Sequence, residues 1–134
     1  MIIKYIIAIL LFSAIILFHE LGHFLLAKAN GIRVNEFSLG LGPTIVGFTK
    51  GETKYSIKLL PFGGACMMEG EDSQSDDDRS FQKKSVWARI SVVAAGPVFN
   101  FIMAFVLSVI IVGAVGYEPS RVLSVKEGSA AEAA

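Results

Sequence analysis

Residues 2–27 read IIKYIIAILLFSAIILFHELGHFLLA, an apolar run without proline and with one glycine, Gly22. At about 1.5 Å per residue, a helix of this length can cross a hydrocarbon core about 30 Å thick. The run therefore predicts a first transmembrane helix, which we assign to residues 1–29. A cleaved signal peptide is the alternative, with Lys4 as its basic start and Ala27-Lys28-Ala29 as its cleavage site. The ionisable residues near the end of the run have no purpose in a signal peptide and argue against it.

The 134 residues are 53% hydrophobic, with a mean hydropathy of +0.59 and a formal net charge of zero. This composition is too apolar for an ordinary soluble domain and indicates a membrane protein. Without a net positive charge there is no electrostatic support for nucleic-acid binding. Because Cys66 is the only cysteine, an internal disulfide and a cysteine-rich zinc site are both excluded, and we expect a small buried hydrophobic residue there.

Residues 86–116 predict a second transmembrane helix, which is apolar from Ile90 to Val115 except for small polar residues. Gly96 and Pro97 are tolerated near its start, because a helix bundle can satisfy the backbone groups that they leave free. The cations that flank the two helices are Lys28, Arg33, Lys83, Lys84 and Arg89 on the loop side, and Lys4, Arg121 and Lys126 on the terminal side. By the positive-inside rule, the loop 30–85 is predicted to be cytoplasmic and both termini extracytoplasmic.

The segment between the two predicted helices contains strand-like sequence. Glu52–Leu60 alternates imperfectly between apolar and polar residues, as a strand does. Pro61 and Gly63-Gly64 stop or bend this strand, and Ala65–Met68 can form a return strand. We therefore expect a small hairpin or ribbon, with Ile45–Phe48 as a further candidate partner.

The next stretch is polar. Residues 69–80 are acidic and rich in serine, which predicts a solvated loop without a core of its own. We expect no metal site at Asp76, Asp77 and Asp78. Residues 81–89 combine cations with Trp87, a mixture typical of a membrane surface.

His19-Glu20-Leu21-Gly22-His23 fits the pattern His-Glu-x-x-His. On a helix, residues four apart project from one face about one turn apart, which suits two imidazoles on one zinc ion. Glu20 then lies beside the ion without binding it and is the predicted general base. Alternatively, the helix ends at Phe18 and these polar residues lie in the interface, but Phe24-Leu25-Leu26 continue the apolar pattern. A charge at the centre of a membrane helix costs about 2.5–3.5 kcal/mol, which favours a functional site.

With these motifs the chain resembles the site-2 protease family of intramembrane zinc metalloproteases, in particular the bacterial type that cleaves anti-sigma factors and remnant signal peptides. The motifs, in order, are Phe18-His-Glu-Leu-Gly-His-Phe24, Phe37-Ser-Leu-Gly-Leu-Gly-Pro43, Tyr55-Ser-Ile-Lys-Leu-Leu-Pro-Phe-Gly-Gly64 and Ala95-Gly-Pro-Val-Phe-Asn-Phe101. The resemblance implies a membrane α-helical fold with two transmembrane helices, a membrane-associated β-hairpin between them and the start of a PDZ domain at residues 117–134. It also implies Zn²⁺ as cofactor and the hydrolysis of peptide bonds in transmembrane segments of single-span membrane proteins.

The resemblance also implies roles for further residues. A re-entrant hairpin around Tyr55–Met68 presents an edge strand to an unwinding substrate helix or, alternatively, plugs the site. Substrate-binding or site-supporting roles fall to Asn100, Gly96, Pro97, Gly63 and Gly64. For Asn100, an active-site role and a role in helix packing both remain open.

One departure from the family pattern concerns the third zinc ligand, an aspartate in a Leu-Asp-Gly motif that does not occur in this sequence. Since catalytic zinc normally has three protein ligands, we expect residues 1–134 alone to be inactive or nearly so. The rival functions are a catalytically inactive membrane PDZ adaptor and a membrane metal transporter or sensor. An intact Glu20 argues against the adaptor. The few polar residues of the second helix, Asn100, Ser91 and Ser108, argue against the transporter.

Overall fold

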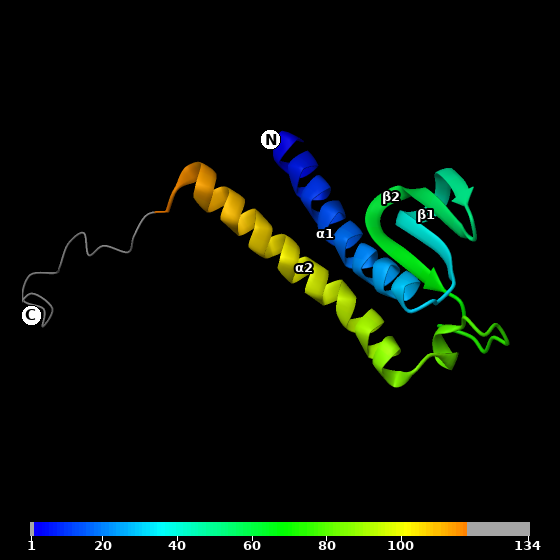
Figure 1. Cartoon of the computed structure of the whole chain (residues 1–134). Coiled ribbons are helices and arrows are strands. Elements are labelled where there is room, and N and C mark those ends of the chain that lie inside the picture. Colours follow the sequence, from blue (N-terminus) through cyan, green and yellow to red (C-terminus); the bar gives the residue numbers. More distant parts are fainter. Residues whose placement is uncertain (1, 118–134) are drawn as a thin grey trace, which may run out of the picture.

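The structure is a computed structural model that describes residues 2–117. Its elements follow the order α1 (Ile2–Ala29), β1 (Val34–Lys50), β2 (Thr53–Met68), a short 3₁₀ helix η1 (Phe81–Lys83) and α2 (Val86–Val115). The helices run in opposite directions, and α1 lies between α2 and the two strands (Figure 1). The predicted pair of membrane-length helices with an antiparallel hairpin between them is confirmed. Apart from Tyr117, the predicted PDZ-like segment lies outside the described residues.

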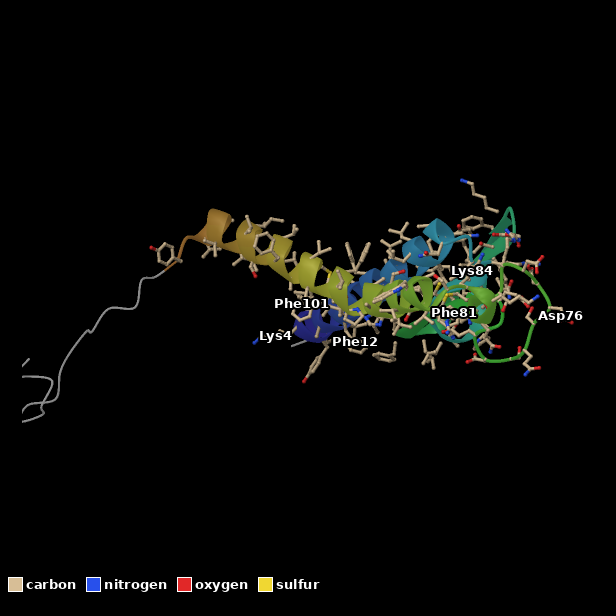
Figure 2. All side chains as sticks on the ribbon, turned by 60° about the horizontal axis from the view of Figure 1, so that its bottom comes forward. Lys4, Phe12, Asp76, Phe81, Lys84 and Phe101 are labelled. Atoms are coloured by element: carbon tan, nitrogen blue, oxygen red, sulfur yellow. The ribbon has the colours of Figure 1, made fainter. Side chains whose placement is uncertain are left out.

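Both helices are long and apolar enough to cross a membrane. Their apolar side chains are largely exposed, with Leu10 at 63% and Phe105 at 70% of full exposure. Phe12 and Phe101 project from the two helices, whereas Asp76 lies on the polar loop at the opposite end of the molecule from the last turns of α2 (Figure 2). So much exposed apolar surface is incompatible with a water-soluble monomer and fits a protein whose helices contact lipid.

The two helices approach each other closely at Gly22. A Cβ atom at this position would lie 2.5 Å from the carbonyl oxygen of Ala95, so the contact requires glycine. Small residues at such crossings are typical of membrane helix pairs. Ser85 caps the start of α2 by accepting a hydrogen bond from the backbone N–H of Ala88 at 3.3 Å. This crossing brings the His-Glu-x-x-His turn of α1 against the first half of α2.

The two strands are long and bent, and their register forms a sheet of four adjacent segments. Residues 44–50 pair antiparallel with 53–58, while residues 36–39 pair antiparallel with 64–67. On their other side, residues 36–39 also pair with residues 54–57. In this pairing the residue numbers of both segments increase together, from 36 with 54 to 39 with 57. The order across the sheet is therefore 64–68, 34–39, 53–58, 44–50. Segment 64–68 is an edge strand, with one side unpaired within residues 2–117.

This arrangement corrects one expectation from the sequence. The hairpin closes at Gly51, where φ is +63°, rather than at Pro61. At Pro61 the strand bends and continues, because Gly63 adopts a φ of +86° that glycine tolerates. Ala65–Met68 consequently pairs with β1 instead of returning along Glu52–Leu60. The candidate partner Ile45–Phe48 does pair with β2, through contacts such as Phe48 with Tyr55.

A small core lies at the loop end of the molecule, where α1, α2 and both strands meet. Its buried members are Ala27, Ile32, Val34, Cys66, Met68 and Val92. The acidic loop is tied to this core, since the backbone N–H of Phe81 donates to the carbonyl of Glu69 at 2.7 Å and that of Arg33 to Arg79 at 3.0 Å. These hydrogen bonds therefore fix the loop 69–80 next to the start of β1 and the end of β2.

A charged clamp connects the hairpin turn to α1 and to the loop. Glu52 accepts hydrogen bonds from Lys28 at 2.7 Å and from Arg79 at 2.5 Å. These two cations lower the pKa of Glu52 below its ordinary value of 4.5. Arg33 pairs in the same way with Asp77 at 3.2 Å. Lys28 also sits in the last turn of α1, where a cation stabilises the helix dipole.

Candidate active site

The two histidines of the motif face the backbone of α2. Their ring centroids are 4.8 Å apart, with the rings nearly perpendicular. A Cβ atom at Gly96 would lie 2.5 Å from Nε2 of His23 and 2.6 Å from Nε2 of His19. Both Nε2 atoms therefore face the same small space, which exists because residue 96 has no side chain. Two imidazole nitrogens that converge in this way are a fitting donor set for zinc.

The other ring nitrogen of His23 is held by the backbone of α2. Its Nδ1 lies 2.8 Å from the carbonyl oxygen of Val92. A carbonyl oxygen can only accept, so Nδ1 carries the proton and donates. Nε2 is then left with a lone pair that can bind a metal ion, as in most zinc-binding histidines.

His19 has its support from Asn100, one turn further along α2 than Gly96. The side-chain amide nitrogen of Asn100 lies 3.2 Å from Nδ1 of His19, and Oδ1 of Asn100 is buried without another partner in the described part of the chain. An amide can present either of its ends to the ring. Metal binding through Nε2 requires a proton on Nδ1, and therefore requires that Oδ1 face His19.

Glu20 opens onto a cavity of about 550 Å³. The cavity is lined by His23, Val92 and Val93 from the helices, by Ala65–Met68 of the sheet edge, and by the polar residues that follow that edge. Space for water and for a peptide therefore lies beside the carboxylate. A carboxylate next to such a space can accept a proton from a water molecule that attacks a bound carbonyl.

The glycines predicted as site-supporting residues have different surroundings. A Cβ atom at Gly64 would lie 3.0 Å from Cγ of Glu20, so this glycine lets β2 pass directly beside the His-Glu-x-x-His turn. Gly63 instead packs against Leu41, where a Cβ atom would approach the side chain to 2.9 Å. Gly63 therefore supports the bend of β2, away from the histidines.

Pro97 follows Gly96 directly in α2 and borders a separate groove beside His19. It lines an apolar groove of about 350 Å³ together with His19, Asn100, Phe101 and Ala104. Pro97 has no N–H and leaves the preceding turn of α2 without one hydrogen bond. The groove gives the His19 side of the site a second open face.

Cys66 is buried as expected, and it lines the cavity beside Glu20. Burial raises the pKa of its thiol to about 12, which makes it an unreactive wall residue. Val92 could not be recognised from the sequence, because it contributes a backbone carbonyl that any residue type would supply. The small size of Gly22 inside the motif was the available signal for the helix crossing.

Known proteins resemble this chain over most of its length. The family model described as "Peptidase family M50" matches residues 7–133. The "Putative zinc metalloprotease CPE1693" of Clostridium perfringens is 45% identical, with 93% of this chain and 37% of the relative covered. A similarly named protein of Clostridium acetobutylicum is 52% identical over 79% of this chain and 31% of its own length. The "Zinc metalloprotease RasP" of Bacillus licheniformis is 29% identical over 93% of this chain and 50% of its own length.

The chain thus spans about a third of the length of the first two relatives. The names of these relatives make zinc the expected cofactor. The match extends over most of the chain and includes both helices and the sheet. This chain belongs to peptidase family M50, the site-2 protease family that its motifs resemble.

Proposed function

We propose that the protein is an intramembrane zinc metalloprotease that hydrolyses peptide bonds in transmembrane segments of single-span membrane proteins, such as anti-sigma factors or signal-peptide remnants. The observation that carries this proposal is the convergence of the two Nε2 atoms at Gly96, with Glu20 on the same helical turn. His19 and His23 are the proposed zinc ligands. A bound zinc ion supplies a Lewis acid that polarises the scissile carbonyl and makes water more acidic.

The residues of this chain divide the remaining tasks. Glu20 accepts the proton of the attacking water and passes it to the leaving nitrogen. The carbonyl of Val92 holds His23 in the tautomer that leaves Nε2 free, and Asn100 does the same for His19 when its Oδ1, rather than its amide nitrogen, faces Nδ1. We therefore propose that Asn100 supports the site, rather than contributing to helix packing alone.

The free edge 64–68 is the proposed binding platform for the substrate. It borders the cavity that contains Glu20, and its outer backbone groups have no strand partner within the described sheet. An extended peptide can add to such an edge through main-chain hydrogen bonds. A helix shields its own amides, so the substrate segment has to unwind before it can pair here.

The proposed orientation places the loop 30–85 in the cytoplasm and the termini outside, because the cations of the loop side outnumber those of the terminal side. Single cysteines at Asp76 and Tyr117, both exposed, would report it in a Cys66→Ala background. We expect an impermeant maleimide added to intact cells to label position 117 and not position 76. The reverse pattern would refute the orientation.

The test of the activity is the Glu20→Gln variant of the full-length protein, reconstituted in liposomes with a single-span substrate. We expect cleavage to fall at least about a hundredfold, since general-base catalysis contributes about 10²–10⁴-fold. Zinc content should stay unchanged, because Glu20 is not a proposed ligand. Asp78→Asn, the same chemical change on the exposed loop, serves as the control. Full cleavage by Glu20→Gln would refute the mechanism. If the protein were instead a metal transporter, the same substitution would leave metal transport unchanged.

A further inference from the structure

Ser13 is a polar residue within the apolar first half of α1, and its hydroxyl bonds a different element. Its Oγ donates to the carbonyl oxygen of Pro61 in β2 at 2.8 Å. A serine inside a helix commonly bonds a carbonyl of its own preceding turn, and Ser108 does so with Ala104 at 2.8 Å. Ser13 instead forms its hydrogen bond outside α1 and so connects this helix to the sheet.

Residue 61, whose carbonyl Ser13 binds, has no partner residue in the described sheet register. The register pairs Leu60 before the bend and Gly64 after it, but none of residues 61–63. The side chains around the bend are apolar and exposed, with Leu59 at 57% and Phe62 at 48%. They fit a bend that contacts lipid, where an unpaired carbonyl is costly. The hydroxyl of Ser13 removes that cost at one point along α1.

From this point β2 follows α1 in the same direction. Gly64 packs against Ile16 and Glu20, and the edge residues after it line the cavity at His23. The seven residues from Ser13 to Glu20 rise about 10 Å in a helix. The three residues from Pro61 to Gly64 span about 10 Å in a strand. A bond at Ser13 and Pro61 therefore brings Gly64 level with Glu20.

We propose that Ser13 is a positioning residue that fixes the register of the edge 64–68 against the catalytic turn, and so selects which peptide bond of the substrate is cut. This inference rests on the proposed role of that edge as the binding platform. A slip of β2 by one residue moves the edge about 3.3 Å and turns its side chains to the other face. A peptide paired to the slipped edge presents a neighbouring bond to Glu20.

The test compares Ser13→Ala, Ser13→Thr and, as matched control, Ser108→Ala in the full-length protein in liposomes. Mass spectrometry of the products gives the bond that is cut. We expect Ser13→Ala to spread cleavage to neighbouring bonds, while Ser13→Thr and Ser108→Ala cut the wild-type bond. Ser13→Ala with an unchanged cleavage bond would overturn the inference.

A second readout does not depend on activity. A nitroxide spin label on Phe62→Cys, in a Cys66→Ala background, reports the motion of the bend. We expect Ser13→Ala to raise the fraction of mobile label about fivefold, as loss of one hydrogen bond allows, and Ser13→Thr to leave it unchanged. An unchanged label would show that the bond does not hold β2 and would also overturn the inference. If no variant, wild type included, cleaved any single-span substrate, the proposed function would fail while the label still reported on the bond.

Discussion

Gly96 lies where α2 passes the imidazoles of α1, and the space beside it is small enough for one methyl group to matter. A Cβ atom there would come within 2.6 Å of both Nε2 atoms. The imidazoles would have to turn away, which would also strain their hydrogen bonds to Val92 and Asn100. The geometry thus makes glycine at this position a condition for the proposed binding of zinc by the two histidines.

For Gly96→Ala we expect zinc affinity to fall about tenfold to a hundredfold, as overpacking costs about 1–3 kcal/mol. Competition with a chromogenic chelator measures the affinity in the full-length protein. Gly113→Ala is the matched control, because a Cβ atom at Gly113 of the same helix would meet nothing within 4 Å. Equal zinc affinities for the two variants would contradict the placement of the metal at Gly96.

Residue by residue, the sequence allowed part of this site to be predicted. The spacing of His19 and His23 requires only helical periodicity, which a long apolar run makes reliable. The pairing of Asn100 with His19 depends on how far α2 slides along α1, which no local pattern encodes. The carbonyl of Val92 carries no residue-specific signal at all. Tertiary packing therefore supplied what sequence periodicity could not.

Among the elements, β2 differs most from expectation. A proline followed closely by two glycines, as in Pro61 and Gly63-Gly64, is typical of the end of a strand. Here the chain continues through them, since Gly63 supplies the positive φ and Ser13 satisfies the carbonyl of Pro61. Both compensations come from three-dimensional context. Gly51 itself was a local indication of the hairpin turn, but Pro61 is the stronger turn-forming residue and led the prediction away from it.

The clamp at Glu52 predicts a pH dependence of stability at the element scale. Its folded pKa lies below 4.5, so its ion pairs stabilise the protein above that pH, and this contribution is lost as pH falls through the folded value. Glu36, Glu69 and Asp77 are shifted in the same direction. We therefore expect the melting temperature in detergent to drop below about pH 4.5.

Glu52→Gln isolates one part of that drop. We expect its melting temperature to lie below the wild-type value at pH 7 and to converge toward it at pH 3.5, as followed by circular dichroism. Lys28→Gln removes a partner of the same carboxylate, so a double-mutant cycle should show that the two effects are not additive. A constant difference in melting temperature between wild type and Glu52→Gln from pH 7 to pH 3.5 would contradict the role of the clamp.

For the molecule as a whole, the ligand count is decisive. Among residues 2–117, no group of three His, Cys, Asp or Glu side chains is arranged to hold a metal ion. Catalytic zinc sites normally use three protein ligands, so we propose that residues 2–117 alone bind zinc weakly and do not cleave. Metal analysis after dialysis should find well below one zinc per chain, and a single-span substrate should remain intact. Stoichiometric zinc with turnover would refute this.

The division of work between the helices sets a lower limit on any minimal unit. A peptide that ended before α2 would retain every ionisable residue of the His-Glu-x-x-His motif. It would nevertheless lack the carbonyl of Val92, the amide of Asn100 and the bare backbone at Gly96. Its imidazoles would be free to choose either tautomer and to rotate into lipid. The smallest unit that holds both imidazoles of the motif in place is thus the antiparallel helix pair, even though the signature itself occupies five consecutive positions of one helix.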